Sequence, residues 1–395
     1  MAIGAATAAC IALLILTFSA WVFVLILGRN RMFKGTAVER AHAFLYDRLP
    51  TAVEAWVERV GAVRWAVRRA EAVWMALFGR RNPLFQILAV VLYWAGIAVF
   101  VFQAAPMIPN RYVGRWQWAP ILLTLATNIA SYVLACATSP GIVDPSNEDA
   151  ACRVFPYDNL LYYADRRCRT CHTRKPARSK HCSVCGRCVQ MMDHHCIWLN
   201  TCVGLHNVRW FLLFLASFSA VCIYGSYLFA TVVLEMRLVL GLDRLLVWND
   251  EQQRMEPLSF KSSLLYLLDD SPLLAIVLVL LLVLTPAVVL FCGYQVRISM
   301  LGYTNNEESK WLNVAEAIGD QVVYETAAPE GPVYEVIEKD EQPADSRPRR
   351  CVGSLAEVKN MYDHGAVGNL ALLFFPPKTQ PLSPLANDRR KAHQS

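Results

Sequence analysis

Five long apolar segments constrain this chain more than any other feature of its sequence. They span approximately residues 3–27, 84–104, 118–138, 210–234 and 272–294, and none contains Asp, Glu, Lys or Arg. A helix needs about 20 consecutive apolar residues to cross a membrane, because its backbone amides find no water there and must be satisfied within the helix. We therefore predict an α-helical polytopic membrane protein with about five transmembrane helices.

The N-terminal segment is too long for a signal peptide. Its apolar run from residue 3 to residue 27 has 25 residues, and no basic stretch precedes it. A signal peptide has a charged N-terminal region and a shorter apolar core. We interpret residues 3–27 as a retained anchor. The alternative is a chain of four spans, in which one of the first three segments is re-entrant or cleaved.

The Lys and Arg residues indicate the orientation of the spans. Residues 28–83, 139–209 and 295–395 hold 11, 10 and 11 of them, whereas residues 105–117 and 235–271 hold 2 and 4. Basic residues concentrate on the cytoplasmic side of a membrane. The N-terminus is therefore expected in the lumen and the C-terminus in the cytosol. The net charge of +6 suits an anionic cytosolic leaflet and does not indicate nucleic acid as a partner.

The spans and the loops between them define the expected domains. They are an N-terminal anchor (1–27), a cytosolic amphipathic helical segment (28–83), a transmembrane hairpin (84–138), a cytosolic cysteine-rich domain (139–209), a second transmembrane hairpin (210–294), a cytosolic C-terminal domain (295–377) and a disordered tail (378–395).

Two of these regions have a recognisable composition. Apolar residues recur every three or four positions across residues 53–77 with Arg between them, which favours a helix in the membrane interface. The alternatives are packing against the cytosolic domain or a short coiled coil. Residues 325–350 are rich in Glu, Asp and Pro, which indicates a mostly solvated linker or surface insert.

Seven of the 13 cysteines fall between residues 168 and 202. The charge pattern places this segment in the reducing cytosol, where crowded cysteines indicate metal binding or catalysis more than disulfides. Two Cys-x2-Cys turns are present, and such a turn lets two thiolates point at one ion. The candidate ligands are Cys168, Cys171, His181, Cys182, Cys185, Cys188, His194, His195, Cys196 and Cys202.

Ten candidates exceed the eight ligands that two tetrahedral zinc sites need. If Cys196 and one of His194 or His195 are spare, two Cys3His sites form and leave a thiol and an imidazole beside Asp193. Nucleophile, base and orienting acid would then lie together, which is the arrangement of nucleophilic catalysis. The alternative is a purely structural zinc module such as a RING-like adaptor, although no closing Cys-x2-Cys follows Cys202.

The segment from Cys168 to Phe211 resembles the cysteine-rich domain of the DHHC protein S-acyltransferases. The matching pattern is Cys168-x2-Cys171-x3-Lys175-Pro176-x-Arg178-x2-His181-Cys182-x2-Cys185-x2-Cys188-x4-Asp193-His194-His195-Cys196-x-Trp198-x-Asn200-x-Cys202-Val203-Gly204-x2-Asn207-x3-Phe211. Two spans precede this segment and two follow it, as the family implies, and the N-terminal segment is additional.

Three outlying motifs resemble the family in part. Ser139-Pro140-Gly141 has Ser where the family has Asp, and Thr304-Asn305-Asn306-Glu307 has Asn305 in place of the second Thr of Thr-Thr-x-Glu. Both departures leave open which contacts these positions make. The third is Asn360-x-Tyr362-Asp363-x-Gly365-x3-Asn369, for which we expect a docking role.

The resemblance implies a role for each residue of the cysteine-rich segment. Cys168, Cys171, His181 and Cys188 would bind one structural Zn²⁺, and Cys182, Cys185, His195 and Cys202 would bind the second. His194 would act as general base, oriented by Asp193, and Cys196 would take the acyl group from an acyl-CoA such as palmitoyl-CoA. Lys175, Arg178 and Lys180 are candidates for the CoA phosphates.

The additional N-terminal span and the context that ends at Lys310-Trp311 resemble an endoplasmic-reticulum subfamily. This resemblance implies membrane-anchored protein substrates with juxtamembrane cysteines, such as SNAREs, at an active site on the cytosolic face. Two other functions remain open at this point: a catalytically silent zinc-dependent membrane adaptor, and an acyltransferase for a small molecule or lipid.

Overall fold

The computed structural model describes residues 79–249, 253–328, 331–336 and 349–377, together with residues 17, 24, 35–49, 65, 68–69 and 72–75. Contacts divide the chain into two compact units. Unit 1 comprises Met1–Glu71, Ile87–Ser131 and Leu213–Gly293, and unit 2 comprises Ala72–Gln86, Tyr132–Leu212 and Tyr294–Ser395.

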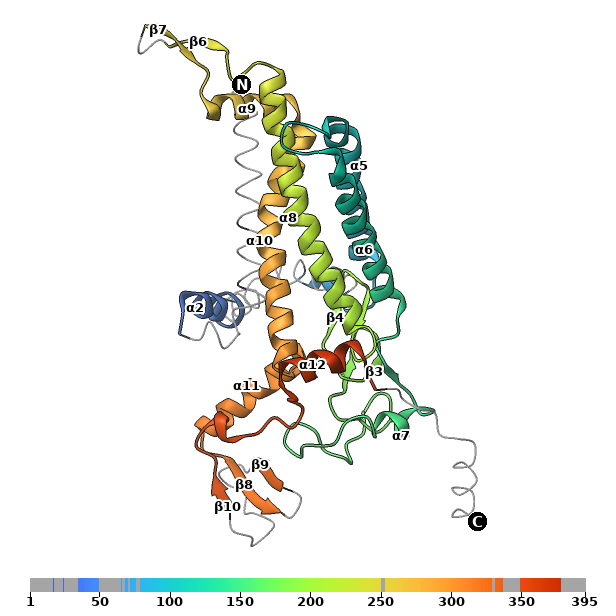
Figure 1. Ribbon diagram of the computed structural model, residues 1–395. Helices are drawn as coiled ribbons and strands as arrows, with labels where there is room; N and C mark the ends of the chain where they lie inside the picture. The colour runs from blue at the N-terminus through green and yellow to red at the C-terminus, as the bar shows by residue number, and fades with distance from the viewer. Residues whose placement is uncertain are drawn as a thin grey trace. The chain divides into compact units, whose positions relative to one another are not determined.

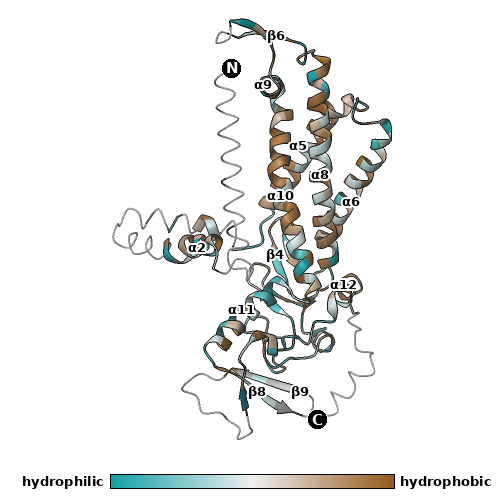
Figure 2. Ribbon diagram, turned by 60° about the vertical axis from the view of Figure 1, so that its left-hand side comes forward, coloured by the Kyte–Doolittle hydropathy of each residue, from teal (hydrophilic) through white to brown (hydrophobic). Residues whose placement is uncertain are grey.

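Unit 1 is built around four long helices that lie side by side (Figure 1). They are long and apolar enough to cross a membrane, at Leu84–Met107, Arg115–Ala137, Val208–Val239 and Pro272–Met300. In Figure 2 their residues are predominantly hydrophobic. The elements that form them are α5 (Leu84–Val99), the π-helix η3 (Phe100–Ala104), the short helices η4 (Ala105–Met107) and η5 (Arg115–Gln117), α6 (Trp118–Ala137), α8 (Val208–Val239) and α10 (Pro272–Met300). The remaining elements of unit 1 are α2 (Ala37–Ala43), η2 (Phe44–Arg48), β6 (Leu246–Asn249), β7 (Arg254–Pro257) and α9 (Phe260–Asp270).

Apolar and polar contacts both hold these helices together. Phe100 of η3 packs against Phe229 of α8, with ring centroids 6.1 Å apart, inside a buried apolar cluster. Asn128 of α6 is only 2% exposed and donates to the hydroxyl of Ser217 in α8 at 3.1 Å. Interhelical hydrogen bonds of this kind stabilise helix pairs where no water competes. The amide of Asn128 therefore fixes α6 against α8.

Unit 2 contains two small sheets from the cysteine-rich segment and a larger C-terminal part. β1 (Ile142–Val143), β3 (Arg187–Val189) and β2 (Lys180–Cys182) form one antiparallel sheet, and β4 (His194–Cys196) pairs with β5 (Thr201–Val203). Gly204 follows β5 where the backbone passes very close to a neighbouring segment. A Cβ there would lie 2.5 Å from the carbonyl oxygen of Pro140. Only glycine fits this approach without displacement.

The C-terminal part of unit 2 begins with a well-capped helix. Thr304 and Glu307 form a capping box, in which each side chain accepts from the backbone N–H of the other residue. Trp311 and Ile318 of this helix pack into a buried cluster with Val323 and Val352. The remaining elements are α7 (Glu148–Ala151), α11 (Asn305–Gly319), β8 (Val323–Ala328), β9 (Gly331–Val336), β10 (Arg349–Cys351), η6 (Leu355–Glu357) and α12 (Gly365–Phe374).

A buried ion pair joins the cysteine-rich segment to α11. Arg178 donates from Nε and Nη2 to the carboxylate of Glu307 at 2.7 and 2.5 Å, and from Nη2 to the carbonyl of Gly302 at 2.8 Å. The two side chains are 3% and 2% exposed. Burial by itself would lower the pKa of Arg178, but the charge of Glu307 outweighs it and raises that pKa. The guanidinium also lies over the Tyr362 ring at 4.9 Å.

The structure differs from the sequence-based prediction in residues 325–350. Instead of a solvated linker, both ends of this segment form a three-stranded antiparallel sheet in the order β10-β8-β9. Apolar side chains such as Val323 and Tyr334 are buried against α11. Their burial favours a sheet, although the segment is rich in Glu, Asp and Pro.

Four of the five predicted spans coincide with helices that could cross a membrane. The predicted anchor at 3–27, apart from residues 17 and 24, lies outside the described residues. So do most of the predicted amphipathic helix at 53–77 and the whole predicted tail at 378–395.

The Arg178–Glu307 pair predicts a large loss of stability when one partner is removed. Glu307→Ala leaves a buried guanidinium without its counter-charge, which costs about 3–5 kcal/mol. Thermal unfolding in detergent, followed by fluorescence-detected size exclusion, measures the effect. Glu325→Ala removes a half-buried partner of the exposed Arg350 and serves as the control, because its melting temperature should stay close to that of the wild type. Equal melting temperatures for the two variants would contradict the role of the buried pair.

Candidate active site and metal-binding clusters

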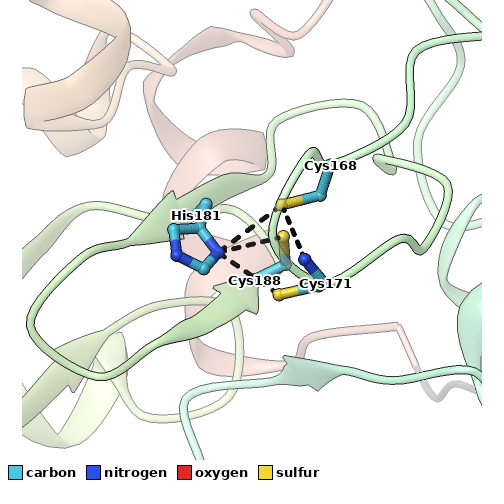
Figure 3. A group of neighbouring side chains, drawn as sticks. All are labelled: Cys168, Cys171, His181 and Cys188. Atoms are coloured by element: carbon cyan, nitrogen blue, oxygen red, sulfur yellow. Dashed lines mark hydrogen bonds between the residues drawn. The ribbon is translucent and has the colours of Figure 1, made fainter.

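The first cluster consists of Cys168, Cys171, His181 and Cys188, whose ligand atoms all lie within 4.8 Å of one another. The Nδ1 atom of His181 lies 3.5, 3.3 and 3.9 Å from the sulfurs of Cys168, Cys171 and Cys188 (Figure 3). Local backbone structure explains this convergence. The Cys-x2-Cys turn places the Cys171 N–H 3.4 Å from the Cys168 sulfur, and His181 lies opposite Cys188 across β2 and β3.

The second cluster repeats this arrangement with Cys182, Cys185, His195 and Cys202. The Nδ1 atom of His195 lies 3.7, 3.3 and 3.7 Å from the sulfurs of Cys182, Cys185 and Cys202. A second Cys-x2-Cys turn and the pairing of His195 with Cys202 across β4 and β5 assemble it. Each cluster offers three sulfurs and one imidazole nitrogen and therefore fits a four-coordinate metal ion.

Strand alternation explains which residues join a cluster. Successive side chains of a β-strand point to opposite faces. His181 and Cys182 are neighbours in β2 and accordingly belong to different clusters. In β4, His195 belongs to the second cluster, so His194 and Cys196 share the other face of the strand. This periodicity could have distinguished His194 from His195 in the sequence without any family resemblance.

Asp193 and His194 form a close pair beside Cys196. The Nδ1–H of His194 donates to the Oδ2 of Asp193 at 2.6 Å. Burial by itself would lower the pKa of His194, but hydrogen bonds and charge from Asp193 and Cys196 outweigh it and raise that pKa to about 10. Burial would raise the pKa of Asp193, yet hydrogen bonds from His194 and Asn305 lower it. The carboxylate is thus held charged against the imidazole, and the Cys196 thiol is buried at 7% exposure.

Asn305 takes up the position that the sequence left open. Its backbone N–H donates to Oδ1 of Asp193 at 2.8 Å, and its side-chain amide donates to Oδ2 at 2.6 Å. Gln295 accepts from the same amide group at 3.1 Å. With the bond from His194, the Asp193 carboxylate therefore accepts three hydrogen bonds. Sequence reasoning missed Gln295, because nothing local marks a residue that lies ten positions before Asn305.

A comparison with protein families identifies the class of enzyme in which this arrangement occurs. The sequence model of the DHHC palmitoyltransferases matches residues 162–312, which include both clusters, Asp193, His194, Cys196 and Asn305. Residues 162–312 form a DHHC palmitoyltransferase domain.

Full-length relatives of this DHHC enzyme bear the same activity in their names. Palmitoyltransferase swf1 of Schizosaccharomyces pombe is 29% identical over 358 residues, which cover 91% of this chain and 94% of the relative. Palmitoyltransferase SWF1 of Yarrowia lipolytica is 26% identical over 92% of this chain and 97% of its own length. Palmitoyltransferase ZDHHC4 of Bos taurus is 36% identical over 36% of this chain and 42% of its own length. The enzyme is accordingly a protein S-acyltransferase.

The three cations predicted to contact CoA phosphates in this DHHC enzyme differ in their surroundings. Lys180 is exposed, and Lys175 is half-buried. Arg178 is 3% exposed and bound to Glu307 and Gly302. A guanidinium committed to buried partners is not accessible to a phosphate, so Arg178 serves the fold of unit 2, and the prediction for this residue is revised.

The two clusters predict the metal content of the enzyme. Cys171→Ser removes a sulfur from the first cluster and should lower the content from two bound ions per chain to one, because the second cluster keeps its four ligands. Inductively coupled plasma mass spectrometry of the purified protein measures this ratio. Cys351→Ser, an exposed cysteine outside both clusters, is the control and should retain both ions. Full metal content in Cys171→Ser would contradict the assignment.

Proposed function

We propose that Cys196 is the acyl-carrying nucleophile of this enzyme. One observation carries the proposal: among the seven cysteines from 168 to 202, Cys196 is the one that belongs to neither metal cluster, and it shares its strand face with His194. The thiol is thereby left for chemistry. His194, bound to the Asp193 carboxylate, is positioned as the base.

The metal in both clusters is proposed to be Zn²⁺ with a structural role. Three cysteine sulfurs and one histidine nitrogen form a donor set that zinc prefers, and four protein ligands leave no open position for water or substrate. Bound zinc would supply the folding energy that fixes β2 to β5. With His195 held in the second cluster, strand alternation places His194 and Cys196 together on the other face of β4.

The reaction proceeds by thioester exchange through the enzyme. His194 accepts the Cys196 proton, and the sulfur attacks the acyl-CoA carbonyl carbon. The new bond from Cys196 sulfur to the acyl carbon forms while the bond to the CoA sulfur breaks, and the proton leaves with CoA. His194 then deprotonates an acceptor cysteine, whose sulfur takes the acyl group and regenerates the Cys196 thiol. A thioester replaces a thioester in each step, so neither step is steeply uphill.

We propose that acyl-CoA is recognised in two parts, with apolar contacts to its acyl chain and cationic side chains at its phosphates. Each buried methylene is worth about 0.8 kcal/mol, so a palmitoyl chain carries about 12 kcal/mol toward an apolar site among the helices. For the phosphates we propose Lys175 and Lys180. Lys310 lies near both lysines: burial lowers its pKa to about 8 against the opposing charges of Glu307 and Asp158, and repulsion from Lys175 and Lys180 contributes to the lowering. Phosphate would relieve that repulsion.

The acceptors are proposed to be membrane-anchored proteins with juxtamembrane cysteines, SNAREs among them. Cys196 lies 12 positions before α8 begins at Val208, which keeps the thiol near the membrane surface. The distribution of basic residues favours the cytosolic face for this site. Residence in the endoplasmic reticulum follows from the resemblance to the subfamily with an additional N-terminal span.

A direct test uses a clickable palmitoyl-CoA and purified protein. The wild type should become labelled at a hydroxylamine-sensitive site, and Cys196→Ser should lose the label while it keeps both metal ions. Cys351→Ser serves as the matched control and should label like the wild type. Label on Cys196→Ser would remove this residue as the nucleophile. An unlabelled wild type would favour a silent adaptor, and transfer in liposomes without protein acceptors would favour lipid acylation.

Asn305 predicts a second effect on the same reaction. Asn305→Leu removes the side-chain donor to Asp193, so the rate of self-acylation should fall about tenfold or more, within the range that general-base catalysis contributes. Asn305→Thr restores a polar side chain and should recover most of the rate. Rapid-quench kinetics with palmitoyl-CoA measure both variants.

Asn313→Leu is the control for this series, because Asn313 is an exposed residue of the same helix. Its rate and its metal content should match the wild type. An Asn305→Leu enzyme with the wild-type rate would show that the contact to Asp193 does not position the base.

A further inference from the structure

The hairpin between α8 and α10 has one apolar face. In the register of β6 and β7, Leu246 lies opposite Pro257, and Trp248 lies opposite Met255. Residues directly opposite each other across a strand pair share a face, and so do residues two apart along one strand. The four side chains therefore form a continuous apolar surface on one side of the hairpin.

The other face of the hairpin is polar. Val247 lies opposite Glu256, and Arg254 follows on the same face two residues from Glu256. An ion pair joins Arg254 Nη2 to Glu256 Oε1 at 2.6 Å. The hairpin is thus amphipathic, with its charges gathered on the side away from Trp248.

The apolar face is not covered within the described part of the chain. Leu246, Trp248 and Met255 are 53%, 53% and 55% exposed. An isolated two-stranded hairpin is marginally stable in water, and an apolar face without a cover makes it less so. This surface therefore needs an apolar environment.

The neighbouring helix α9 is fixed to the spanning helices and exposes further apolar groups. Arg237 of α8 donates to the hydroxyl of Ser263 at 2.9 Å, and Leu267 is 2% exposed in the core of unit 1. On its outer side, Phe260 and Tyr266 are 54% and 51% exposed. The position of α9 is thus set by α8, and the helix leaves these two aromatic rings partly exposed.

The hairpin and α9 are continuous in sequence with two spanning helices, and this indicates the membrane surface as the environment of the apolar face. β6 begins at Leu246, shortly after α8 ends at Val239, and α9 ends at Asp270, next to the start of α10 at Pro272. A segment between two adjacent span ends lies at the membrane surface. Trp and Tyr are enriched at that depth, and Arg and Lys can extend toward the headgroups.

We propose that residues 246–249 and 253–270 form an interfacial segment that inserts Leu246, Trp248 and Met255 among the phospholipids at the membrane surface reached by the C-terminal end of α8. Arg254 and Glu256 face water. The segment binds lipid as an amphipathic element lying in the plane of the interface. It therefore anchors the connection between the third and fourth of the described spans.

Photocrosslinking to lipid tests this proposal on the full chain in nanodiscs. The photoreactive residue benzoylphenylalanine replaces Trp248 or, as the matched control, its neighbour Val247 on the polar face. The nanodisc contains a fluorescent phosphatidylcholine, and the adduct is quantified on a gel. Leu282, a 58% exposed residue inside α10, provides the positive control at span depth. Metal content and self-acylation of each variant confirm that the protein is folded.

The proposal predicts a lipid adduct at position 248 about fivefold or more above that at position 247, because alternate residues of a strand face opposite environments. Equal adducts at 247 and 248, or none at 248 while 282 reacts, would overturn it. A crosslink from 248 to a second copy of the chain in place of lipid would also overturn it and would identify a protein as the occupant.

Discussion

The convergence of sulfur and imidazole side chains on two points holds the cysteine-rich segment together, and the site depends on it. The apolar clusters in this segment are small and consist largely of the cysteines themselves: Cys168 and Cys188 with Val143 and Ala151 in one, and Cys182 and Cys202 with Val189 and Met192 in the other. Such a segment cannot bury enough apolar surface to fold on hydrophobic energy alone. Metal coordination at the two clusters would supply what the core lacks and would stabilise the strand pairs.

Within unit 2, the proposed reacting groups Asp193, His194 and Cys196 are positioned by two elements, β4 and α11. The alternation of β4 assigns His195 to a cluster and leaves His194 and Cys196 together, while α11 provides Asn305 against Asp193. The ion pair between Arg178 and Glu307 fixes the start of α11 against the cysteine-rich segment. A carboxylate that already accepts three hydrogen bonds needs little rearrangement when His194 takes a proton, and such preorganisation lowers the cost of the chemical step.

Sequence predicted the features that have short-range signals. Span length and the Cys-x2-Cys spacing are local, so four helices and two Cys3His sites could be predicted from them, whereas the ligands of each site were assigned only through the family resemblance. Contacts between distant positions have no such signal. The burial of Arg178 depends on Glu307, 129 residues away, and a basic residue in this segment is easily taken for a contact to the CoA phosphates. The sheet at residues 323–351 was hidden for a similar reason, because its few buried apolar residues matter more than its charged composition.

The central claim is that the metals leave Cys196 as the one free thiol among the seven cysteines from 168 to 202 and that this thiol reacts. Single-turnover acylation of the metal-loaded wild type, followed by acid quenching and peptide mapping by mass spectrometry, tests it most directly. The account predicts the acyl mass on Cys196 and none on the six cysteines of the two clusters. An acyl group on Cys182 or Cys202, with Cys196 unmodified, would contradict it.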